Sequence, residues 1–538
     1  MSEDRSTRRE FLRRAGATSA ISIAALGAGL ALDDCSKQSR TSTSTSTSTS
    51  TSTSTSTTTT TLGPATSRDW ANLASSLTGT LVRPTSASYA TSSLLYNAKF
   101  VGLHPQGIAY CASSQDVARC VDFATSHQMA MCARSGGHSY AGYSSCDGLV
   151  IDVSRLNAVG VDTASNTAVI GAGALLIDVY NEVGANNRLL PAGSCPTVGV
   201  AGLALGGGIG VFARRYGLTS DNLRALEVVT ADGTLVRANE SDHADMLWAS
   251  RGGGGGNFGV VTSLTLDVHV MPEVTLFTLQ YPWAAAATML EAWLNWIDTA
   301  PDELWSNCVL ESQGTYGFLG QVGGVFCGSP SELATYLSSL TSAIAATPTY
   351  SFSGSNSYLT AMEIEAGCSG LSVAACHLSS QNPHGQLSRE AYSAKSSYVN
   401  GPLSSAGCAR IVDAIEHLAS LAPTLGGALA FDSYGGVINR VPSDATAFVH
   451  RDKLACIQAT YSWSSGASAS VIDAGQSWLT WLGTNVFDPA SGAYQNYIDP
   501  TLSNWQSAYY GSNFDRLVTV KRLYDPDNQF SFAQSIPV

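Results

Sequence analysis

Charge is scarce in this sequence. Charged residues make up only 13% of the 538 residues, and 41 Asp and Glu outnumber 28 Lys and Arg, which gives a formal net charge of −13. A nucleic-acid-binding protein needs a basic face for the phosphates, so this composition excludes that class and gives no support for polyanionic substrates. The apolar fraction of 44% is enough for a large buried core. The length exceeds one average domain, so we expect two intertwined units or one large two-part domain.

Spacings typical of metal sites are also missing. The sequence has no C-x-x-C and no H-x-x-x-H arrangement, so we predict no metal. Its 12 cysteines permit disulfides in an exported protein, but sequence alone cannot assign their connectivity. Cys368 and Cys376 lie close together in a loop-like stretch and are candidates for a pair, whereas Cys35 is a candidate for an unpaired thiol.

The N-terminus carries an export signature. Residues 6–13 read STRREFLR, with the adjacent arginines of a twin-arginine signal, and an apolar run continues to Leu32. A transmembrane anchor is the alternative, but the run is short and rich in Gly and Ala, so we favour a signal peptide over residues 1–31. Residues 41–61 are almost pure Ser and Thr with nothing to bury, so residues 32–68 are expected to form a disordered tether.

Two glycine-containing loops carry reactive side chains. The first, which we call the histidine loop, is residues 134–140 (RSGGHSY), and the second, the cysteine loop, is residues 191–199 (PAGSCPTVG). Adjacent glycines let backbone N–H groups approach an anion closely, and Arg134 adds positive charge beside His138. Cys195 precedes a proline, on a turn that no regular helix continues. A lone histidine in a glycine loop is more often structural, but two reactive side chains in two such loops indicate a chemical site.

This pair of loops resembles the berberine-bridge-enzyme-like flavin oxidases, which share the vanillyl-alcohol-oxidase type of FAD domain. The resemblance runs from about residue 84 to the last residue. It implies that His138 is bonded to the 8α-methyl group of FAD and Cys195 to C6 of the isoalloxazine, and their separation of 57 residues is of the size that the family uses.

The same resemblance implies an α+β fold. A two-part FAD-binding domain is expected in residues 69–270, completed by a C-terminal segment, residues 498–538, that returns to it. Residues 271–497 are expected to form a substrate-binding domain with an antiparallel sheet covered by helices. Residues 107–136 read as strand, helix, strand, and the second strand delivers the histidine loop.

Two further glycine-rich segments are expected to contact FAD on the resemblance. In the segment 206–210 (GGGIG), the match to the dinucleotide fingerprint G-x-G-x-x-A begins at Gly208 and covers residues 208–213 (GIGVFA). A nicotinamide site or a plain tight turn are therefore alternatives. No clean parallel strand precedes the match, and Arg214 and Arg215 stand where the helix should pack, so we favour a loop that wraps FAD. Residues 252–256 are consecutive glycines, which suits backbone that must touch the FAD pyrophosphate, although a flexible linker is the alternative.

The predicted cofactor-binding residues come from these four segments, from residues 202 and 257–261 beside them, and from the C-terminus. They are His138 and Cys195 as attachment points, with Arg134, Ser135, Gly136, Gly137, Ser139, Tyr140, Gly193, Thr197, Val198, Gly199, Gly202, Gly206, Gly207, Gly208, Gly210, Gly256, Asn257, Gly259, Val260, Val261, Tyr510 and Asn513.

The catalytic base is a separate prediction. An alcohol oxidation needs a group that accepts the hydroxyl proton as hydride leaves for the flavin. Tyr497 is the first candidate and Tyr494 the second, with Asp432 or Tyr434 tuning the tyrosine or sharing the proton. A free tyrosine with a pKa near ~10 is a poor base at neutral pH, so its neighbours must tune it. The alternative is that the tyrosines only line an aromatic cleft, and His450 is better explained as a structural histidine.

The resemblance implies an exported oxidase that transfers hydride from a hydroxyl group to flavin N5. The expected substrate is an oligosaccharide or a sugar-containing or polyketide-type natural product. Val198 occupies the family position beside the oxygen-reactive edge of the flavin, where a valine leaves room for O2 and favours H2O2 as product. A dehydrogenase with another acceptor and a non-catalytic flavin-retaining protein are the alternatives. We expect a monomer, exported by the twin-arginine route to the periplasm, cell surface or medium, with no nucleic acid partner and no membrane contact beyond export.

Overall fold

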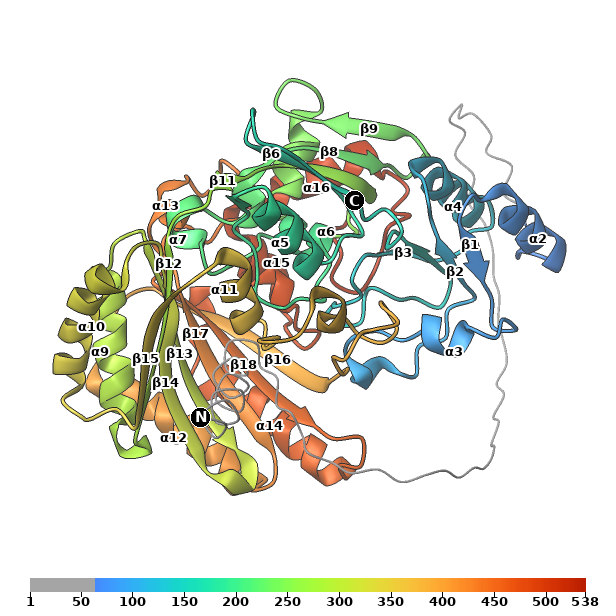
Figure 1. The fold of residues 1–538 in the computed structure, drawn as a ribbon. Coiled ribbons are helices and arrows are strands. Elements are labelled where there is room, and N and C mark those ends of the chain that lie inside the picture. Colours follow the sequence, from blue (N-terminus) through green and yellow to red (C-terminus); the bar gives the residue numbers. More distant parts are fainter. Residues whose placement is uncertain (1–62) are drawn as a thin grey trace.

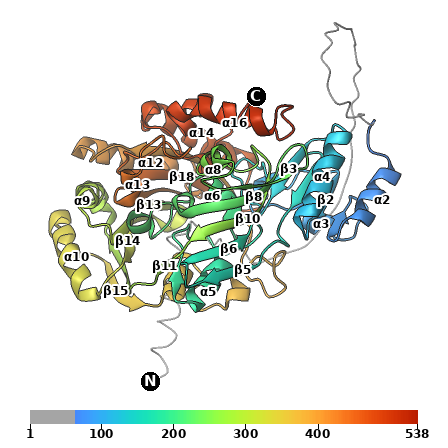
Figure 2. The ribbon, with the colours of Figure 1, turned by 90° about the horizontal axis from the view of Figure 1, so that it is seen from above.

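The structure is a computed structural model that describes residues 63–538. The predicted signal peptide, its alternative as an anchor and most of the Ser/Thr tether lie outside these residues. The described chain forms three main sheets, and the five-stranded sheet lies between the four-stranded and the seven-stranded ones (Figures 1 and 2). Within residues 63–538, no helix is long and apolar enough to cross a membrane.

The four-stranded sheet delivers the histidine loop. Its order is β1-β2-β4-β3, and β2 and β3 both run parallel to β4. The predicted strand–helix–strand unit is confirmed as β2, α4 and β3, because α4 buries Val117, Val121 and Ala124 and the chain then returns to the sheet. The elements are β1 (Thr80–Val82), β2 (Gly107–Tyr110), β3 (Met131–Arg134) and β4 (Leu149–Asp152), with helices α2 (Ser67–Ser76), α3 (Tyr89–Ser92) and α4 (Ser114–Ser126).

The five-stranded sheet is antiparallel, in the order β5-β6-β10-β8-β9. The helix that leads into the cysteine loop, α5, packs against α11. The strands are β5 (Val159–Asp162), β6 (Thr167–Gly171), β8 (Leu223–Val229), β9 (Leu235–Ala238) and β10 (Val260–Asp267), and β7 (Arg188–Leu189) pairs with β11 (His269–Val270). The helices are α5 (Leu176–Ala185), α6 (Val200–Leu205), α7 (Ala213–Tyr216), α8 (Ala244–Ser250) and α11 (Tyr358–Glu365).

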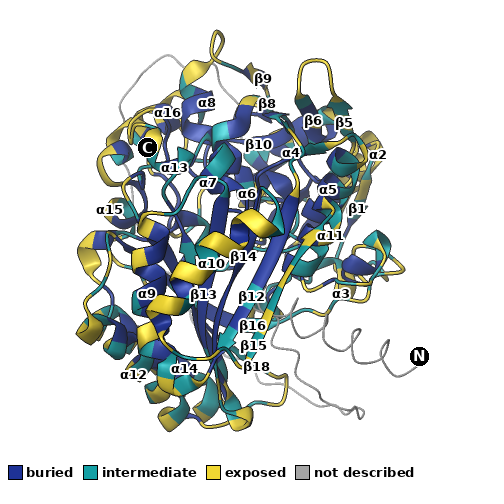
Figure 3. Cartoon of the chain, turned by 60° about the vertical axis from the view of Figure 1, so that its left-hand side comes forward, coloured by how far each residue is buried: buried dark blue, intermediate teal, exposed yellow. Residues whose placement is uncertain are grey.

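The seven-stranded sheet is wholly antiparallel, in the order β15-β12-β14-β13-β17-β18-β16. Four long helices, α9, α10, α12 and α14, cover one face, and their outer sides are exposed (Figures 1 and 3). The strands are β12 (Val274–Tyr281), β13 (Leu304–Gln313), β14 (Phe318–Phe326), β15 (Tyr350–Asn356), β16 (Ala391–Val399), β17 (Gly426–Ser433) and β18 (Ala455–Trp463). The helices are α9 (Ala286–Asp298), α10 (Pro330–Ile344), α12 (Ser405–Leu421), α13 (Val437–Arg440) and α14 (Ala469–Asn485).

The alternation of side chains fixes which face of this sheet meets the helices. Successive residues of a strand point to opposite faces, so a shift of one residue would exchange the two faces. Leu304, Cys308 and Leu310 of β13 belong to the apolar core beneath the helices. Trp305, Asn307 and Val309, at the alternate positions, point to the other face, toward the first half of the chain.

The C-terminal segment packs on the first half of the chain. Helices α15 (Trp505–Tyr510) and α16 (Phe514–Tyr524) follow the seven-stranded sheet, and Leu517, Val520 and Ile536 join the core that begins at Trp70. The Lys521 ammonium is fully buried and binds Asp525 at 2.6 Å and the carbonyl of Asn257 at 2.8 Å. The predicted α+β fold class, with an antiparallel sheet covered by helices, is therefore confirmed, while the domain boundaries at residues 270 and 497 stay predictions.

Candidate active site

One cavity of about 1910 Å³ separates the first half of the chain from the open face of the seven-stranded sheet. A pocket for one drug-sized ligand measures about 300–1,000 Å³, so this cavity has room for a larger group and a second molecule. Its walls come from residues 131–144, 193–211 and 255–261, from strands β13, β17 and β18, and from residues 494–498.

The histidine loop and the cysteine loop touch through their glycines. A Cβ on Gly136 would lie 2.3 Å from the backbone N of Gly199, and a Cβ on Gly199 would lie 2.0 Å from Oγ of Ser135. The start of α5 holds the second loop, since the N–H groups of Leu176 and Ile177 donate to the carbonyls of residues 198 and 196. Any larger residue at either glycine would force the two loops apart.

Thr197 lies between the two reactive side chains. Its hydroxyl oxygen is 2.9 Å from Nε2 of His138 and 3.9 Å from Sγ of Cys195, and the residue is only 1% exposed. Tyr96 stacks on the imidazole with ring centroids 4.0 Å apart. His138 and Cys195, which are 57 residues apart in the sequence, thus meet around one hydroxyl group at the cavity wall.

Burial sets the protonation of both groups. It lowers the pKa of His138 to about 3, which leaves a neutral imidazole with a free ring nitrogen at neutral pH. It raises the pKa of the Cys195 thiol to about 11, against hydrogen bonds at residue 197 that lower it. The imidazole is therefore ready to act as a nucleophile, whereas the thiol must first lose its proton.

Arg134 is a buried cation beside the cavity. Its Nε donates to Asp152 at 2.5 Å, and both side chains are almost fully buried. Its Nη1 has no hydrogen-bond partner among residues 63–538. An unpaired guanidinium nitrogen at a cavity wall lined by glycine backbone fits an anionic group such as a pyrophosphate.

The third glycine segment follows the same wall. Gly256 has φ +74° and Gly259 φ +152°, and a Cβ on Gly259 would lie 2.4 Å from the carbonyl oxygen of Val229. Asn257 does not line the cavity but holds the segment, because its Nδ2 donates to the Gly253 carbonyl and its Oδ1 accepts from the N–H of Ile536. Glycine is needed here for its conformation as well as its size.

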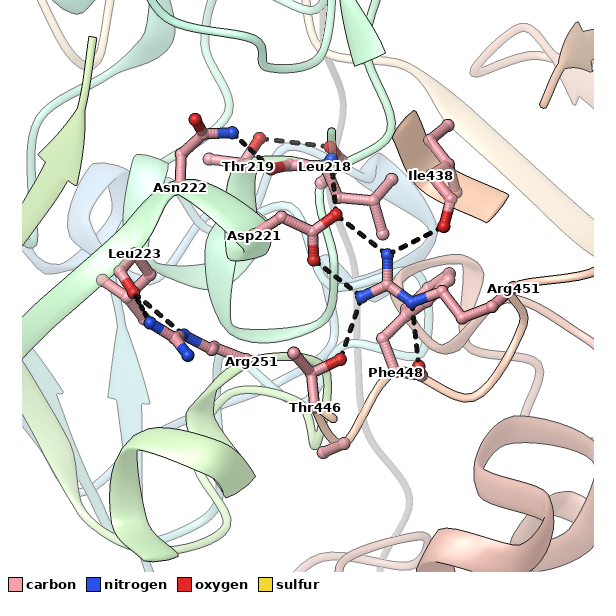
Figure 4. Close-up of polar contacts among 12 residues, drawn as sticks. Leu218, Thr219, Asp221, Asn222, Leu223, Arg251, Ile438, Thr446, Phe448 and Arg451 are labelled. Atoms are coloured by element: carbon pink, nitrogen blue, oxygen red, sulfur yellow. Dashed lines mark hydrogen bonds and ion pairs between the residues drawn. The ribbon is translucent and has the colours of Figure 1, made fainter. Parts of the chain in front are cut away.

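A buried ion pair links the turn before β8 to the segment that follows α13 (Figure 4). Arg451 binds both carboxylate oxygens of Asp221, at 2.6 and 2.8 Å, and also donates to Oγ1 of Thr446. Arg251, just before the glycines, donates twice to the carbonyl of Leu223. A bidentate pair fixes both distance and orientation, so residues 221 and 451 hold these two segments of the chain together.

The structure sorts the predicted cofactor residues into two groups. Those that line the cavity are Arg134, Ser135, Gly136, Gly137, His138, Ser139, Tyr140, Gly193, Cys195, Thr197, Val198, Gly199, Gly202, Gly210, Gly256, Gly259, Val260 and Val261. Those that lie behind the wall are Gly206, Gly207, Gly208, Asn257, Tyr510 and Asn513.

The residues behind the wall hold neighbouring segments. The N–H of Gly208 donates to the Tyr494 hydroxyl at 2.8 Å, Tyr510 donates to the Gly253 carbonyl at 3.1 Å, and Asn513 donates to the carbonyls of residues 443 and 446. The alternative, a nicotinamide site, would need a strand directly before the fingerprint and a packed helix after it. Residues 206–210 instead form a loop between α6 and the four-residue helix α7. Arg214, on that helix, is buried and donates to the Tyr434 carbonyl.

The open face of the seven-stranded sheet forms the opposite wall of the cavity, which we call the sheet wall. Its cavity-lining side chains come from alternate positions, whose register places Asn307 opposite Asp432 and Ala430 opposite Gln458. Trp305 Nε1, Asn307 Oδ1 and Thr460 Oγ1 are buried and have no hydrogen-bond partner within residues 63–538. The members of this wall are Trp305, Asn307 and Val309 of β13, Ala430 and Asp432 of β17, and Gln458, Thr460 and Ser462 of β18.

Tyr497 lies where the two walls meet, in the 3-10 turn Gln495–Tyr497. Its ring stacks on Tyr140 at 5.3 Å and meets Tyr494 edge-on at 4.9 Å. Burial, and then the charge of Asp432, raises the pKa of Tyr497 well above its usual value. Burial also raises the pKa of Asp432 to about 7, so this carboxyl group changes charge at neutral pH.

Tyr494, the second candidate for the base, and Tyr434, a candidate for tuning it, both make hydrogen bonds to other parts of the protein. The Tyr494 hydroxyl accepts hydrogen bonds from the N–H groups of Gly208 and Ile209 and from Nδ2 of Asn496. Tyr434 does not line the cavity, and its hydroxyl lies 3.4 Å from that of Tyr398 in a separate apolar cluster. His450 is also buried outside the cavity, as expected for a structural histidine.

Several residues that line the cavity were not predicted from the sequence. Glu390, which precedes β16, lines the cavity, and burial raises the pKa of its carboxyl group to about 7. Gln458 donates to the Tyr140 hydroxyl at 2.6 Å. None of them stands in a glycine loop, and only the alternation within β18 would have singled out Gln458. The residues concerned are Tyr96, Trp305, Asn307, Glu390, Tyr392, Gln458 and Thr460. Within residues 63–538, no group of three His, Cys, Asp or Glu residues is placed to hold a metal.

Known proteins are similar to this chain in sequence and in fold. Residues 105–239 match the family described as FAD binding domain, and residues 493–537 match the one described as berberine and berberine like. The chain is 33% identical to the FAD-linked oxidoreductase YgaK of Bacillus subtilis, covering 81% of this chain and 91% of the relative. It is 28% identical to glucooligosaccharide oxidase of Sarocladium strictum, covering 81% and 88%. The solved structure of BBE-like 1 from Physcomitrella patens matches with a TM-score of 0.79 and 30% identity, over 87% of this chain and 98% of that one.

Proposed function

Because the chain belongs to the berberine-bridge-enzyme-like FAD-linked oxidoreductases, we propose that it is an oxidase with FAD attached at two points. His138 and Cys195 are the attachment residues, joined to the 8α-methyl group and to C6. The observation that carries this proposal is the meeting of both side chains around the Thr197 hydroxyl. The unpaired Arg134 nitrogen and the glycine backbone of residues 256 and 259 would hold the phosphates.

The reaction we propose is the oxidation of a hydroxyl group. FAD supplies the hydride acceptor when it is bound. The substrate lies against the sheet wall, where the unpaired polar atoms of Trp305, Asn307 and Thr460 satisfy its hydroxyl groups. Their neutral character suits an uncharged, hydroxyl-rich molecule such as an oligosaccharide or a glycosylated natural product, and glucooligosaccharide oxidase is among the relatives.

Asp432 and Tyr497 take the proton in this proposal. Tyr497 keeps its proton at neutral pH, so it must pass a proton on as it accepts one from the substrate. Asp432, with a pKa of about 7, is the acidic group on the same wall that can receive it. Tyr497 therefore contacts the substrate, and Asp432 stores the proton.

O2 is the proposed acceptor, and H2O2 the product. Val198 lines the cavity three residues after Cys195 and leaves space beside the attachment point. A dehydrogenase would instead turn over only with an added acceptor. Peroxide release measured against turnover with an artificial acceptor separates the two.

Attachment is tested on denatured protein. In an acid-precipitated sample, the yellow colour should stay with the polypeptide in the wild type and in each of His138→Ala and Cys195→Ala. Only the double variant should release it. Release of all flavin from the wild type would contradict the proposal.

Export and a monomeric state are part of the same proposal. Cells that produce the full chain should hold it outside the cytoplasm, and Arg8→Lys together with Arg9→Lys should retain it inside. Activity in the cytoplasmic fraction of both strains would contradict export. Light scattering of the exported protein should give the mass of one chain.

A further inference from the structure

Six of the eleven cysteines that the structure describes lie in three close pairs. Sγ of Cys111 is 4.0 Å from Sγ of Cys120, and the thiols of Cys132 and Cys146, and of Cys368 and Cys376, are in hydrogen-bonding contact. The second pair differs from the others in access. Cys132 and Cys146 are both partly exposed, whereas the other four side chains are fully buried.

The local structure brings Cys146 back to the strand that carries Cys132. Cys132 lies in β3, and Sγ of Cys146 is 3.8 Å from the carbonyl oxygen of Ala130 and 3.6 Å from that of Leu149. The N–H of Leu149 donates to that same Ala130 carbonyl at 2.9 Å. The chain therefore leaves β3, makes the histidine loop and returns to the beginning of β3, where the two thiols meet.

We propose that Cys132 and Cys146 form a disulfide that closes a ring of 15 residues around the entire histidine loop. The ring contains Arg134 and His138, so both ends of the flavin-attachment loop become covalently tied. Whether the bond forms in the cell rests on the proposed export, since disulfides persist in oxidising compartments. The thiol contact itself does not rest on the proposed function.

The bond forms by exchange with a disulfide-bearing oxidant. The thiolate of Cys146 attacks one sulfur of the oxidant and releases a thiolate, and Cys132 then attacks the mixed disulfide. Two protein S–H bonds are lost and one S–S bond forms, while the oxidant gains two electrons and two protons as two thiols. The hydrogen bond from Cys132 lowers the pKa of Cys146, which favours Cys146 as the attacking thiol.

Trypsin places the two cysteines of this bond in different peptides. Cleavage after Arg119, Arg134 and Arg155 places Cys132 in peptide 120–134, and both His138 and Cys146 in peptide 135–155. The purified flavin-containing enzyme is incubated with oxidised glutathione, alkylated and digested without reductant. Mass spectrometry should find peptides 120–134 and 135–155 joined, and reduction should separate them. Because peptide 120–134 also contains Cys120, fragmentation of the joined peptides must place the bond on Cys132.

The same digest reports the flavin bonds independently. Attached FAD would join peptide 135–155 to peptide 189–214, which contains Cys195, and this link would survive reduction. Recovery of Cys132 and Cys146 alkylated would overturn the disulfide. A reducible link of peptide 120–134 to peptide 100–119 would instead report the other pair, Cys111 and Cys120, and would leave the proposal unaffected. Neither result would depend on whether the flavin link is present.

A thiol count in denaturant gives a matched control. Cys146→Ser should raise the number of titratable thiols by one, because it frees Cys132. Cys327→Ser, which removes a buried cysteine outside the three pairs, should lower the count by one. If both variants lower the count by one, Cys132 and Cys146 are free thiols in the native enzyme and the proposal is wrong.

Discussion

The two walls of the cavity are built by different means. We call the wall formed by residues 134–140, 193–211 and 255–261 the flavin wall. It uses backbone, brought close by glycines at residues 136, 199, 256 and 259, together with the side chains of the histidine and cysteine loops. The sheet wall uses side chains at alternate positions of strands that lie far apart in the sequence. A backbone surface tolerates almost no change in its sequence, whereas a side-chain surface can be changed without moving the strands.

The largest expected effect comes from filling a backbone contact. Gly136→Val should give protein without bound flavin, because its Cβ would lie 2.3 Å from the backbone of Gly199 and would separate the two loops. Absorbance near the flavin bands, relative to protein, measures the loss. Gly102→Ala is the control, since nothing lies within 4 Å of a Cβ at that position. Normal flavin content in Gly136→Val would show that the contact between the loops is unnecessary.

The residues of the flavin wall can be predicted from the sequence because this wall depends on glycine, which is also why it tolerates few substitutions. Backbone that must approach a ligand needs glycine, and runs such as residues 252–256 leave a visible mark. All the predicted residues of the histidine and cysteine loops line the cavity. The sequence also predicts Asn257 and Asn513 as cofactor-binding residues, but their amides donate to backbone carbonyls instead. Sequence alone does not distinguish this structural role from cofactor binding.

No comparable sequence pattern predicts the residues of the sheet wall. Trp305, Asn307 and Thr460 lie on one face of the sheet only because of the register of β13, β17 and β18, which short-range patterns do not specify. Tyr434 illustrates the limit. It follows Asp432 by two residues and would share its face in a continuing strand, but β17 ends at Ser433 and Gly435 adopts φ +89°. The chain turns away, and the ring enters a separate cluster.

The second prediction concerns the proton acceptor on the sheet wall. Asp432→Asn should lower kcat/KM by about 10²–10⁴-fold, the usual contribution of a general base. In the wild type, protonation of Asp432 below its pKa of about 7 removes the acceptor, so kcat/KM should fall about tenfold per pH unit below 7 and level off above it. The variant should lack this fall.

Two other carboxyl groups serve as controls. Burial raises the pKa of both Glu311 and Glu390 to about 7, but only Glu390 lines the cavity. Glu311→Gln should keep the wild-type pH profile. If the fall persists in Asp432→Asn and disappears in Glu390→Gln, the proton acceptor is Glu390.

The third prediction tests a side chain within the backbone wall. Thr197→Val removes the hydroxyl that binds Nε2 of His138, so the imidazole loses its fixed orientation. We expect attachment through His138 to become incomplete while the Cys195 bond still forms. Tryptic peptides 135–155 and 189–214 report the two bonds separately. Thr197→Ser keeps a hydroxyl and should restore both, so equal attachment in the valine and serine variants would exclude the proposed role.

The smallest effect is expected on the side-chain wall. Trp305→Phe removes an indole N–H that has no partner within residues 63–538, while the aromatic ring and the strand remain. A neutral hydrogen bond contributes about 0.5–1.5 kcal/mol, so KM for a hydroxyl-rich substrate should rise up to about tenfold with kcat little changed. Flavin content should stay at the wild-type level, because the residue belongs to the opposite wall. A loss of flavin in this variant would mean that the two walls are not independent, and the contrast between backbone and side-chain surfaces would fail.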